Sequence, residues 1–204
     1  MKSILNFSFL LLCFCTLSSL SQSPKDYLIT ETSFGKINKT TTYKDLIKLY
    51  GQKNIKDDID FGPEGQDSFY ITKIYPETVK EFRVFWKDKS FHKKISHIGF
   101  YIDKSPYFTK SGLKIGSTLR KLLQANGNKK INFSGFGWDY GGSISSYNKG
   151  KLEKSNIEFH LHLGYTGFID DQSISGDIDL NTGMPLIKKM LDKIYISFIT
   201  LHFR

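Results

Sequence analysis

Two stretches of the chain repeat apolar residues with the spacing of an amphipathic helix. Each stretch begins with two hydroxyl residues, Thr41-Thr42 or Ser117-Thr118, and each ends at a glycine, Gly51 or Gly127. Hydroxyl residues are preferred before the first helical turn and glycine after the last one, and Asp45 adds an approximate capping box to the first stretch. The apolar positions are Tyr43, Leu46 and Ile47 in one stretch and Leu119, Leu122 and Leu123 in the other. The pattern predicts two short helices.

After each predicted helix the period of the apolar positions changes to two, which is typical of half-buried strands. The predicted strands are Ser68–Tyr75, Val79–Trp86 and Ile95–Ile102 in the first half, and Ser143–Tyr147, Asn156–Leu163 and Ile194–Phe203 in the second. A third short helix, at about Pro185–Asp192, leads into the last strand, because proline suits the first helical turn.

Neighbouring strands without a helix between them pair in antiparallel fashion. The predicted fold class is therefore α+β, a tandem repeat of a short helix followed by an antiparallel β-meander, with the helices packed on the sheet. We expect a first helix-meander unit at residues 22–104 and a second at residues 105–204, with a linker at about 103–112. One continuous domain is the alternative.

The N-terminus has the features of a secretory signal peptide. Lys2 precedes an apolar run up to Leu20, and Ser19 and Ser21 supply small residues for a signal peptidase. We predict a signal peptide over residues 1–21 and export to the periplasm or the extracellular space. Both cysteines lie inside this segment without the small residue that precedes a lipidated cysteine, so a lipid anchor is not expected. The exported chain would contain no cysteine and no disulfide.

The charge of the chain limits its possible partners. Its formal net charge is +9, but the lysines are scattered, without the run of basic residues that marks a nucleic-acid patch. Dispersed positive charge favours anionic surfaces. For an exported protein we expect an acidic protein or an anionic envelope polymer as partner, no nucleic acid, no stable membrane span after signal cleavage, and no cofactor.

The octapeptide GFGWDYGG, residues 135–142, combines glycines with three aromatic residues and one acid. If residues 136–140 are extended, Phe136, Trp138 and Tyr140 project from one face of the strand. These rings then either pack beneath the second helix or form a surface for a ligand or partner. Both interpretations fit the sequence.

A second group of polar residues lies on the predicted strand Asn156–Leu163. Glu158, His160 and His162 alternate with apolar residues and therefore share one face. A His-x-His pair with a nearby carboxylate can bind zinc, although the polar face of a half-exposed strand has the same pattern. His97 and His202 stand alone in the sequence and are interpreted as packing or surface residues.

Several of these motifs follow one another in an order that resembles an uncharacterised family of exported bacterial proteins. The motifs are the GLKxG sequence at 112–116, Asn126-Gly127, the GFGWDYGG octapeptide and the Gly150-Lys151-Leu152 turn. Residues 61–65 and 85–88 are similar to the first half of that family, while Tyr147 departs from an expected tryptophan. The resemblance implies export and a shared architecture but no activity. The duplicated helix-plus-sheet plan is also similar to secreted beta-lactamase inhibitor proteins.

The sequence thus predicts a non-enzymatic extracytoplasmic binding or inhibitor-like module with an aromatic-rich sheet surface. The residues expected on this surface are Trp138, Asp139, Tyr140, Tyr147 and Trp86.

The alternative is a hydrolase that acts on cell-envelope material. It would require Asp139, Glu158, His160 and His162 to converge in one pocket.

Overall fold

The computed structural model describes residues 23–62, 65, 67–87, 90–164 and 172–204. The predicted signal peptide, residues 1–21, lies outside this part. Among the described helices, none has the length and apolar character needed to cross a membrane.

The three predicted helices are present. They are α1 (Tyr43–Tyr50), α2 (Leu119–Ala125) and α3 (Pro185–Met190). The predicted capping box of α1 is confirmed, because the Thr42 side chain accepts a hydrogen bond from the Asp45 amide and the Asp45 carboxylate accepts one from the Thr42 amide. Thr118 caps α2 in the same way with its hydroxyl. Local sequence therefore fixes where these two helices begin.

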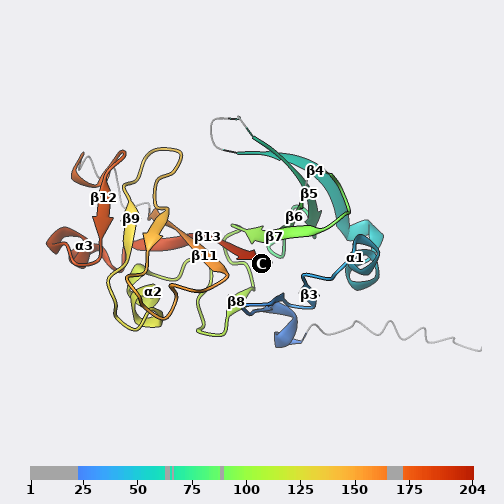
Figure 1. The fold of residues 1–204 in the computed structure, drawn as a ribbon, viewed down its shortest axis with the longest axis horizontal. Coiled ribbons are helices and arrows are strands. Elements are labelled where there is room, and N and C mark those ends of the chain that lie inside the picture. The colour runs from blue at the N-terminus through green and yellow to red at the C-terminus, as the bar shows by residue number, and fades with distance from the viewer. Residues whose placement is uncertain (1–22, 63–64, 66, 88–89, 165–171) are drawn as a thin grey trace, which may run out of the picture.

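A six-stranded antiparallel sheet forms the centre of the molecule (Figure 1). Its spatial order is β11 (Ile157–Leu163), β13 (Ile194–His202), β7 (Ile95–Phe100), β6 (Phe82–Trp86), β5 (Ser68–Ile74) and β4 (Ile55–Phe61). Strands β5 to β7 form the meander predicted for the first half, and β4 extends it. Strand β13 pairs with β7, with Ile199 opposite Phe100 and Leu201 opposite Ile98.

This pairing corrects the expected organisation into two separate meanders. The long strands β11 and β13 of the second half extend the sheet of the first half. The chain is α+β, but the described strands do not form two repeated sheets. Strand β4 was not predicted, and residues 79–81 lie outside β6.

Two smaller sheets complete the fold. One contains β3 (Ile37–Asn38), β2 (Ser33–Phe34), β1 (Leu28–Ile29) and β8 (Phe108–Thr109), and the other contains β10 (Ile144–Ser146), β9 (Asn132–Ser134) and β12 (Asp179–Asn181). Short 3-10 helices lie at Pro24–Tyr27, Gln52–Asn54 and Gln172–Ile174. The expected linker contributes β8, which pairs in parallel with β1, so the linker region is part of the folded body.

One face of the six-stranded sheet is covered and the other is open. Val84, Ile98, Ile199 and Phe159 point from four adjacent strands into a single hydrophobic core, which also contains Leu46 of α1. In Figure 1 the small sheet with β3 and β8 lies below the central sheet. Above it, between the hairpin of β4 and β5 and the hairpin of β9 and β10, no described helix or strand covers the other face. This uncovered face is where exposed side chains can gather.

The packing of α1 gives a direct test of this core. Replacing Leu46, which is fully buried, by alanine should lower the free energy of unfolding by about 2–5 kcal/mol through lost burial and a cavity. Leu49→Ala in the same helix, at a side chain that is 38% exposed, should change it by less than about 0.5 kcal/mol. Urea denaturation followed by circular dichroism measures both, and equal losses would contradict the described packing.

Candidate functional site

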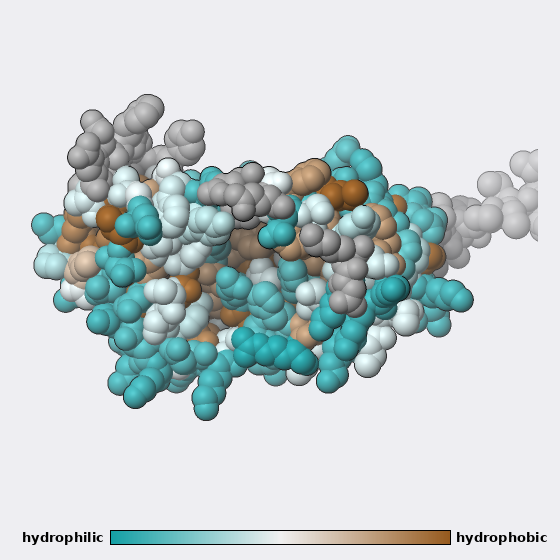
Figure 2. Space-filling view, turned by 45° about the horizontal axis from the view of Figure 1, so that its top comes forward, coloured by the Kyte–Doolittle hydropathy of each residue, from teal (hydrophilic) through white to brown (hydrophobic). Residues whose placement is uncertain are grey.

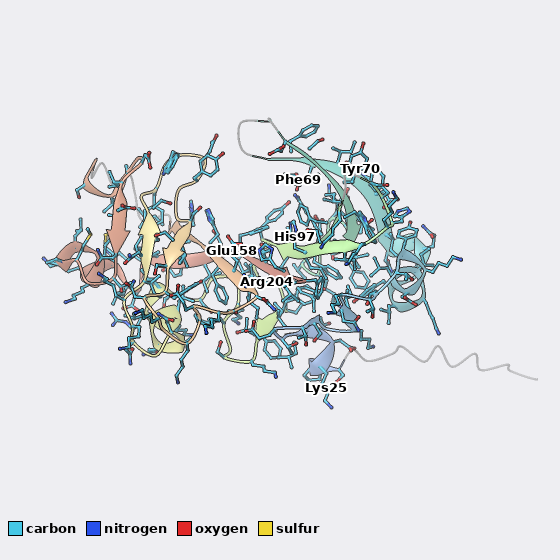
Figure 3. The ribbon with its side chains drawn as sticks, viewed as in Figure 1. Lys25, Phe69, Tyr70, His97, Glu158 and Arg204 are labelled. Atoms are coloured by element: carbon cyan, nitrogen blue, oxygen red, sulfur yellow. The ribbon has the colours of Figure 1, made fainter. Side chains whose placement is uncertain are left out.

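A row of four rings and one carboxylate crosses the uncovered face, with one residue from each of five adjacent strands. The residues are Phe69 on β5, Phe85 on β6, His97 on β7, His202 on β13 and Glu158 on β11. We call this row the ring ladder. The pairing of the strands explains the middle of the ladder, because Phe85 lies opposite His97 and His97 lies opposite His202. Figure 3 shows Phe69, His97 and Glu158 spread over the middle of the molecule.

The contacts along the ring ladder are continuous. The ring centroids of Phe69 and Phe85 are 6.1 Å apart, and Phe85 stacks on His97 at 4.1 Å. The rings of His97 and His202 are 5.4 Å apart. At the far end the Nε2 atom of His202 lies 2.8 Å from a carboxylate oxygen of Glu158. The ladder is therefore apolar at β5 and polar at β11.

A second group of side chains lies beside the ladder on the same face. The guanidinium of Arg83 lies 4.5 Å from the centre of the Tyr101 ring and pairs with the carboxylate of Asp60. Tyr101 stacks with Phe198 at 6.2 Å. Gly99 makes room for this arrangement, since a Cβ atom there would lie 2.7 Å from the Phe198 ring. The open face is thus rich in rings, with one cation over an aromatic ring.

Burial changes the titration of the ladder. Desolvation, and then the nearby His202, lower the pKa of His97 to about 4. Desolvation also lowers the pKa of His160. At Glu158 the hydrogen bond with His202 holds the pKa below its ordinary value. Near neutral pH the face therefore carries a neutral His97 beside an ionised Glu158.

The GFGWDYGG octapeptide lies beside this face, but its conformation differs from the predicted extended strand. It forms the turn between β9 and β10, in which the amide of Gly141 donates to the carbonyl of Trp138. Phe136 is buried in the core, whereas Trp138 and Tyr140 are 36% and 47% exposed and contact each other edge to face. Asp139 is also exposed. The three aromatic residues therefore do not share one face, and two of them project outward.

The glycines explain why the turn is tight. Gly142 has a φ of +80°, and a Cβ atom there would lie 2.0 Å from the carbonyl oxygen of Leu161 on β11. The Gly142 carbonyl accepts a hydrogen bond from the Leu161 amide. A Cβ atom at Gly135 would lie 2.6 Å from the carbonyl oxygen of Gly176. The octapeptide is thus a folding device that also presents Trp138 and Tyr140.

Trp86 and Tyr147 are placed differently from the expected aromatic surface. Trp86 is 5% exposed, and its indole N–H donates to the hydroxyl of Thr72 at 2.8 Å, so it belongs to the core. Tyr147 is half-buried and packs against the core, and burial raises the pKa of its hydroxyl. The expectation that Trp86 joins Trp138 and Tyr140 on a surface is wrong, because Trp86 lies two residues after the fully buried Val84 and therefore on the core-facing side of β6.

Tyr147 is held in place by a contact between two sequence motifs. The side-chain amide of Asn126 donates to the carbonyl of Tyr147 at 2.9 Å, and its oxygen accepts from the Leu152 amide at 3.2 Å. A Cβ atom at Gly150 would lie 2.1 Å from the Asn126 side chain. The Asn126-Gly127 helix end and the Gly150-Lys151-Leu152 turn therefore form one unit, which positions the chain that leaves β10.

A polar groove of about 630 Å³ lies where β10 separates from β11, and we call it the terminal groove. One wall contains Ser145, Ser146 and Tyr147, and the other contains Glu158 and His202. Lys87, Ser96 and Arg204 also line it. A second hollow of about 400 Å³, the side hollow, shares His202, Phe203 and Arg204 with it. The polar end of the ring ladder thus opens into a groove.

A depression is visible on this side of the molecule in a space-filling view. Figure 2 shows hydrophobic residues gathered near its floor and hydrophilic residues around it. A smaller hollow of about 340 Å³ lies beside Phe69 and His97.

The proposed metal ligands Glu158, His160 and His162 lie on β11, but their side chains do not come together as a metal site. In the described residues no group of three or more His, Cys, Asp or Glu side chains is arranged to hold a metal ion. Glu158 instead pairs with His202, which the sequence interpretation had treated as isolated. A period of two along each strand could have placed the ladder residues on one face, but only the strand order shows that they are neighbours.

Comparisons with known proteins give a fold and no activity. Neither a protein-family model nor a curated protein matches the chain. The structure is similar to the crystal structure of the uncharacterized protein yfeY from Escherichia coli, with a TM-score of 0.50 and 14% sequence identity. The similarity covers 85% of this chain and 98% of that one. The likeness supports the α+β architecture alone, because the identity is low.

Gly142 allows a prediction about the octapeptide. Gly142→Ala should lower the free energy of unfolding by about 3 kcal/mol or more, because backbone strain adds to the clash with Leu161. Gly137→Ala is the matched control: Gly137 has the same φ of +80° but no atom within 4 Å of its Cβ position, so we expect a loss of about 1 kcal/mol. Thermal and urea denaturation measure both, and equal losses would show that the Leu161 contact is unimportant.

The lowered pKa of His97 predicts a pH dependence of stability. Between pH 6.5 and 5 the unfolded chain binds a proton at this position and the folded chain does not, so stability falls as the pH falls. The slope contributed by His97 is at most about 1.4 kcal/mol per pH unit. His160 adds a slope of the same sign. The pKa of Glu158 is lowered from 4.5, so protonation of Glu158 reduces the stability only at pH values below this range.

His97→Phe keeps a ring on Phe85 and removes the titrating group. Urea denaturation at several pH values between 6.5 and 5 should show a shallower slope for His97→Phe than for the wild type. Leu49→Ala, at an exposed position on α1, serves as control and should keep the wild-type slope. An unchanged slope in His97→Phe would mean that His97 is not buried as described.

Proposed function

We propose that this protein is an exported, non-enzymatic binding module that takes its partner on the uncovered face of the six-stranded sheet. The observation that carries this proposal is the ring ladder, an unbroken series of contacts from Phe69 to Glu158 on a face over which no described element packs. The expected partner is an envelope polymer or a protein.

Exposed rings in the ladder and outside it support a binding role. Phe69 and Tyr101 are 38% and 41% exposed on the uncovered face, and Trp138 and Tyr140 are 36% and 47% exposed in the turn between β9 and β10. Aromatic side chains bury a large area with few rotatable bonds, which makes them frequent anchors in interfaces and at sugar-stacking surfaces. Tyr147 contributes to the neighbouring groove instead. The partner would therefore contact Phe69 of the ladder together with Tyr101, Trp138 and Tyr140.

Export rests on the N-terminal sequence. The charged start, the apolar run and the small residues near Ser21 support a signal peptide over residues 1–21. The absence of cysteine from the rest of the sequence suits a protein whose stability comes from its core in an oxidising or a reducing compartment. We place the protein in the periplasm or outside the cell.

The hydrolase alternative has less support. It requires Asp139, Glu158, His160 and His162 to act together. Glu158 is instead engaged by His202, and Asp139 lies exposed in the turn between β9 and β10. The contacts of these side chains favour binding over catalysis.

A sedimentation experiment tests the proposal. Purified cell-envelope material should carry the wild-type protein into the pellet, and the double variant Phe69→Ala/Trp138→Ala should bind at least tenfold more weakly, since a ring at the centre of an interface contributes about 2 kcal/mol. Both side chains are partly exposed, so the variant should fold.

Leu49→Ala provides the matched control, because Leu49 is as exposed as Phe69 but lies on α1. Its binding should equal that of the wild type. Unchanged binding by the double variant, or an equal loss in Leu49→Ala, would contradict the assignment of the binding face.

A further inference from the structure

In the terminal groove and the side hollow, the acidic side chains have partners within the described part of the chain and the lysine and arginine side chains do not. Each of the three glutamate side chains in their lining already has a hydrogen-bond partner within the chain. The pairs are Glu158 with His202 (2.8 Å), Glu153 with the Lys149 amide (3.0 Å), and Glu31 with the Ser155 hydroxyl (2.9 Å) and the Asn156 amide (2.6 Å). These acids therefore act mainly as internal structural partners.

The cations of the same two hollows have no such partners. Lys87 lines the terminal groove, Lys39 lines the side hollow, and Arg204 lines both. Within the described residues, none of the three side chains makes an ion pair or a hydrogen bond. Other cations of the uncovered face are paired, such as Lys73 with Asp58 and Arg83 with Asp60. The three cationic side chains are therefore available to a ligand, while the three glutamates, equal in number, are held by contacts within the chain.

The remaining lining is rich in hydroxyl and amide groups. Ser96, Ser145 and Ser146 line the terminal groove, and Thr32, Asn38, Thr40 and Asn156 line the side hollow. Tyr147 adds an aromatic wall. Such groups donate to and accept from sugar hydroxyls, and an aromatic wall suits the apolar face of a sugar ring.

We propose that the terminal groove and the side hollow form one track for an acidic polysaccharide, whose anionic groups pair with Lys39, Lys87 and Arg204. This inference rests on the proposed binding function and names the class of polymer that the module takes. The anionic group on the sugar is a carboxylate or a phosphate, because both accept hydrogen bonds from lysine and arginine.

The arrangement of the cations favours a polymer over a small anion. Lys87 and Lys39 belong to different hollows, and Arg204 lies at the junction of the two. A single small anion in one hollow leaves the cation of the other hollow unpaired. A chain with a repeated negative charge can engage all three, and each hollow has the volume of a site for a small molecule.

Calorimetric titration with oligogalacturonate at low salt tests this inference. A neutral malto-oligosaccharide of the same length tests the need for charge, and inorganic polyphosphate and single-stranded DNA test the need for the sugar. We expect the oligogalacturonate to bind and the neutral sugar to bind at least tenfold more weakly. Lys39→Met, Lys87→Met and Arg204→Gln should each weaken binding about tenfold, the size expected for one lost hydrogen bond to a charged group.

Lys121→Met is the matched control, because Lys121 is an exposed lysine on α2 outside both hollows. Its affinity should stay that of the wild type. Added salt should weaken binding by the wild type more than binding by a variant that combines Lys39→Met, Lys87→Met and Arg204→Gln, since each ion contact made with a polyanion releases counterions. A similar loss in Lys121→Met would show that net charge, and not the track, binds the polymer.

The other outcomes separate this inference from the proposed function. Equal binding of polyphosphate or single-stranded DNA would overturn the preference for an acidic sugar. Binding of the neutral sugar that is lost in Phe69→Ala but kept in the three cation variants would overturn the track and leave the uncovered face as a binding surface. If none of the sugars binds, the track is wrong, while sedimentation with envelope material still decides the proposed function.

Discussion

The antiparallel pairing of β7 with β13 is the constraint on which the rest of the structure depends. It connects the meander of residues 55–100 to the last strand of the chain and places His202 opposite His97. Without this register the ring ladder would be two separate fragments, Phe69 to His97 on one side and His202 to Glu158 on the other. The pairing also brings Ile199 and Leu201 into the core. One set of strand contacts therefore creates both the core and the open face.

The two faces of this sheet differ in the kind of side chain they carry and in the partners of these side chains. On the covered face the side chains of the central strands, such as Val84, Ile98 and Ile199, are apolar and lose nearly all contact with water. On the open face the charged groups are largely paired within the sheet, as with Arg83 and Asp60, while several rings stay partly exposed. Unpaired cations occur at its polar end, around Arg204. The open face thus changes from apolar rings at β5 to a polar end at which Arg204 and Lys87 make no ion pair with any other described residue.

Local sequence could predict the three helices and most of the longer strands, but neither the short strands of the two small sheets nor the neighbours of each strand. Caps and periodicity located α1, α2, β5, β7, β11 and β13, because these signals depend on residues close together in the chain. Strand β4 escaped prediction, since Asp57, Asp58 and Asp60 obscure its pattern. Their charges are compatible with a strand only because His92, Lys73 and Arg83 lie beside them in the folded sheet. The turn at Gly142 likewise depends on the distant Leu161, and the ladder depends on strand order.

The pairing of β7 with β13 can be measured directly by nuclear Overhauser effects between side-chain protons in the labelled protein. The structure predicts contacts from the His97 ring to both Phe85 and His202, whose ring centroids lie 4.1 and 5.4 Å away. It also predicts contacts between Ile98 and Leu201, which lie opposite each other. A His202 ring with contacts to β11 and none to β7 would contradict the account, because the sheet, the ladder and the open face would then not be continuous.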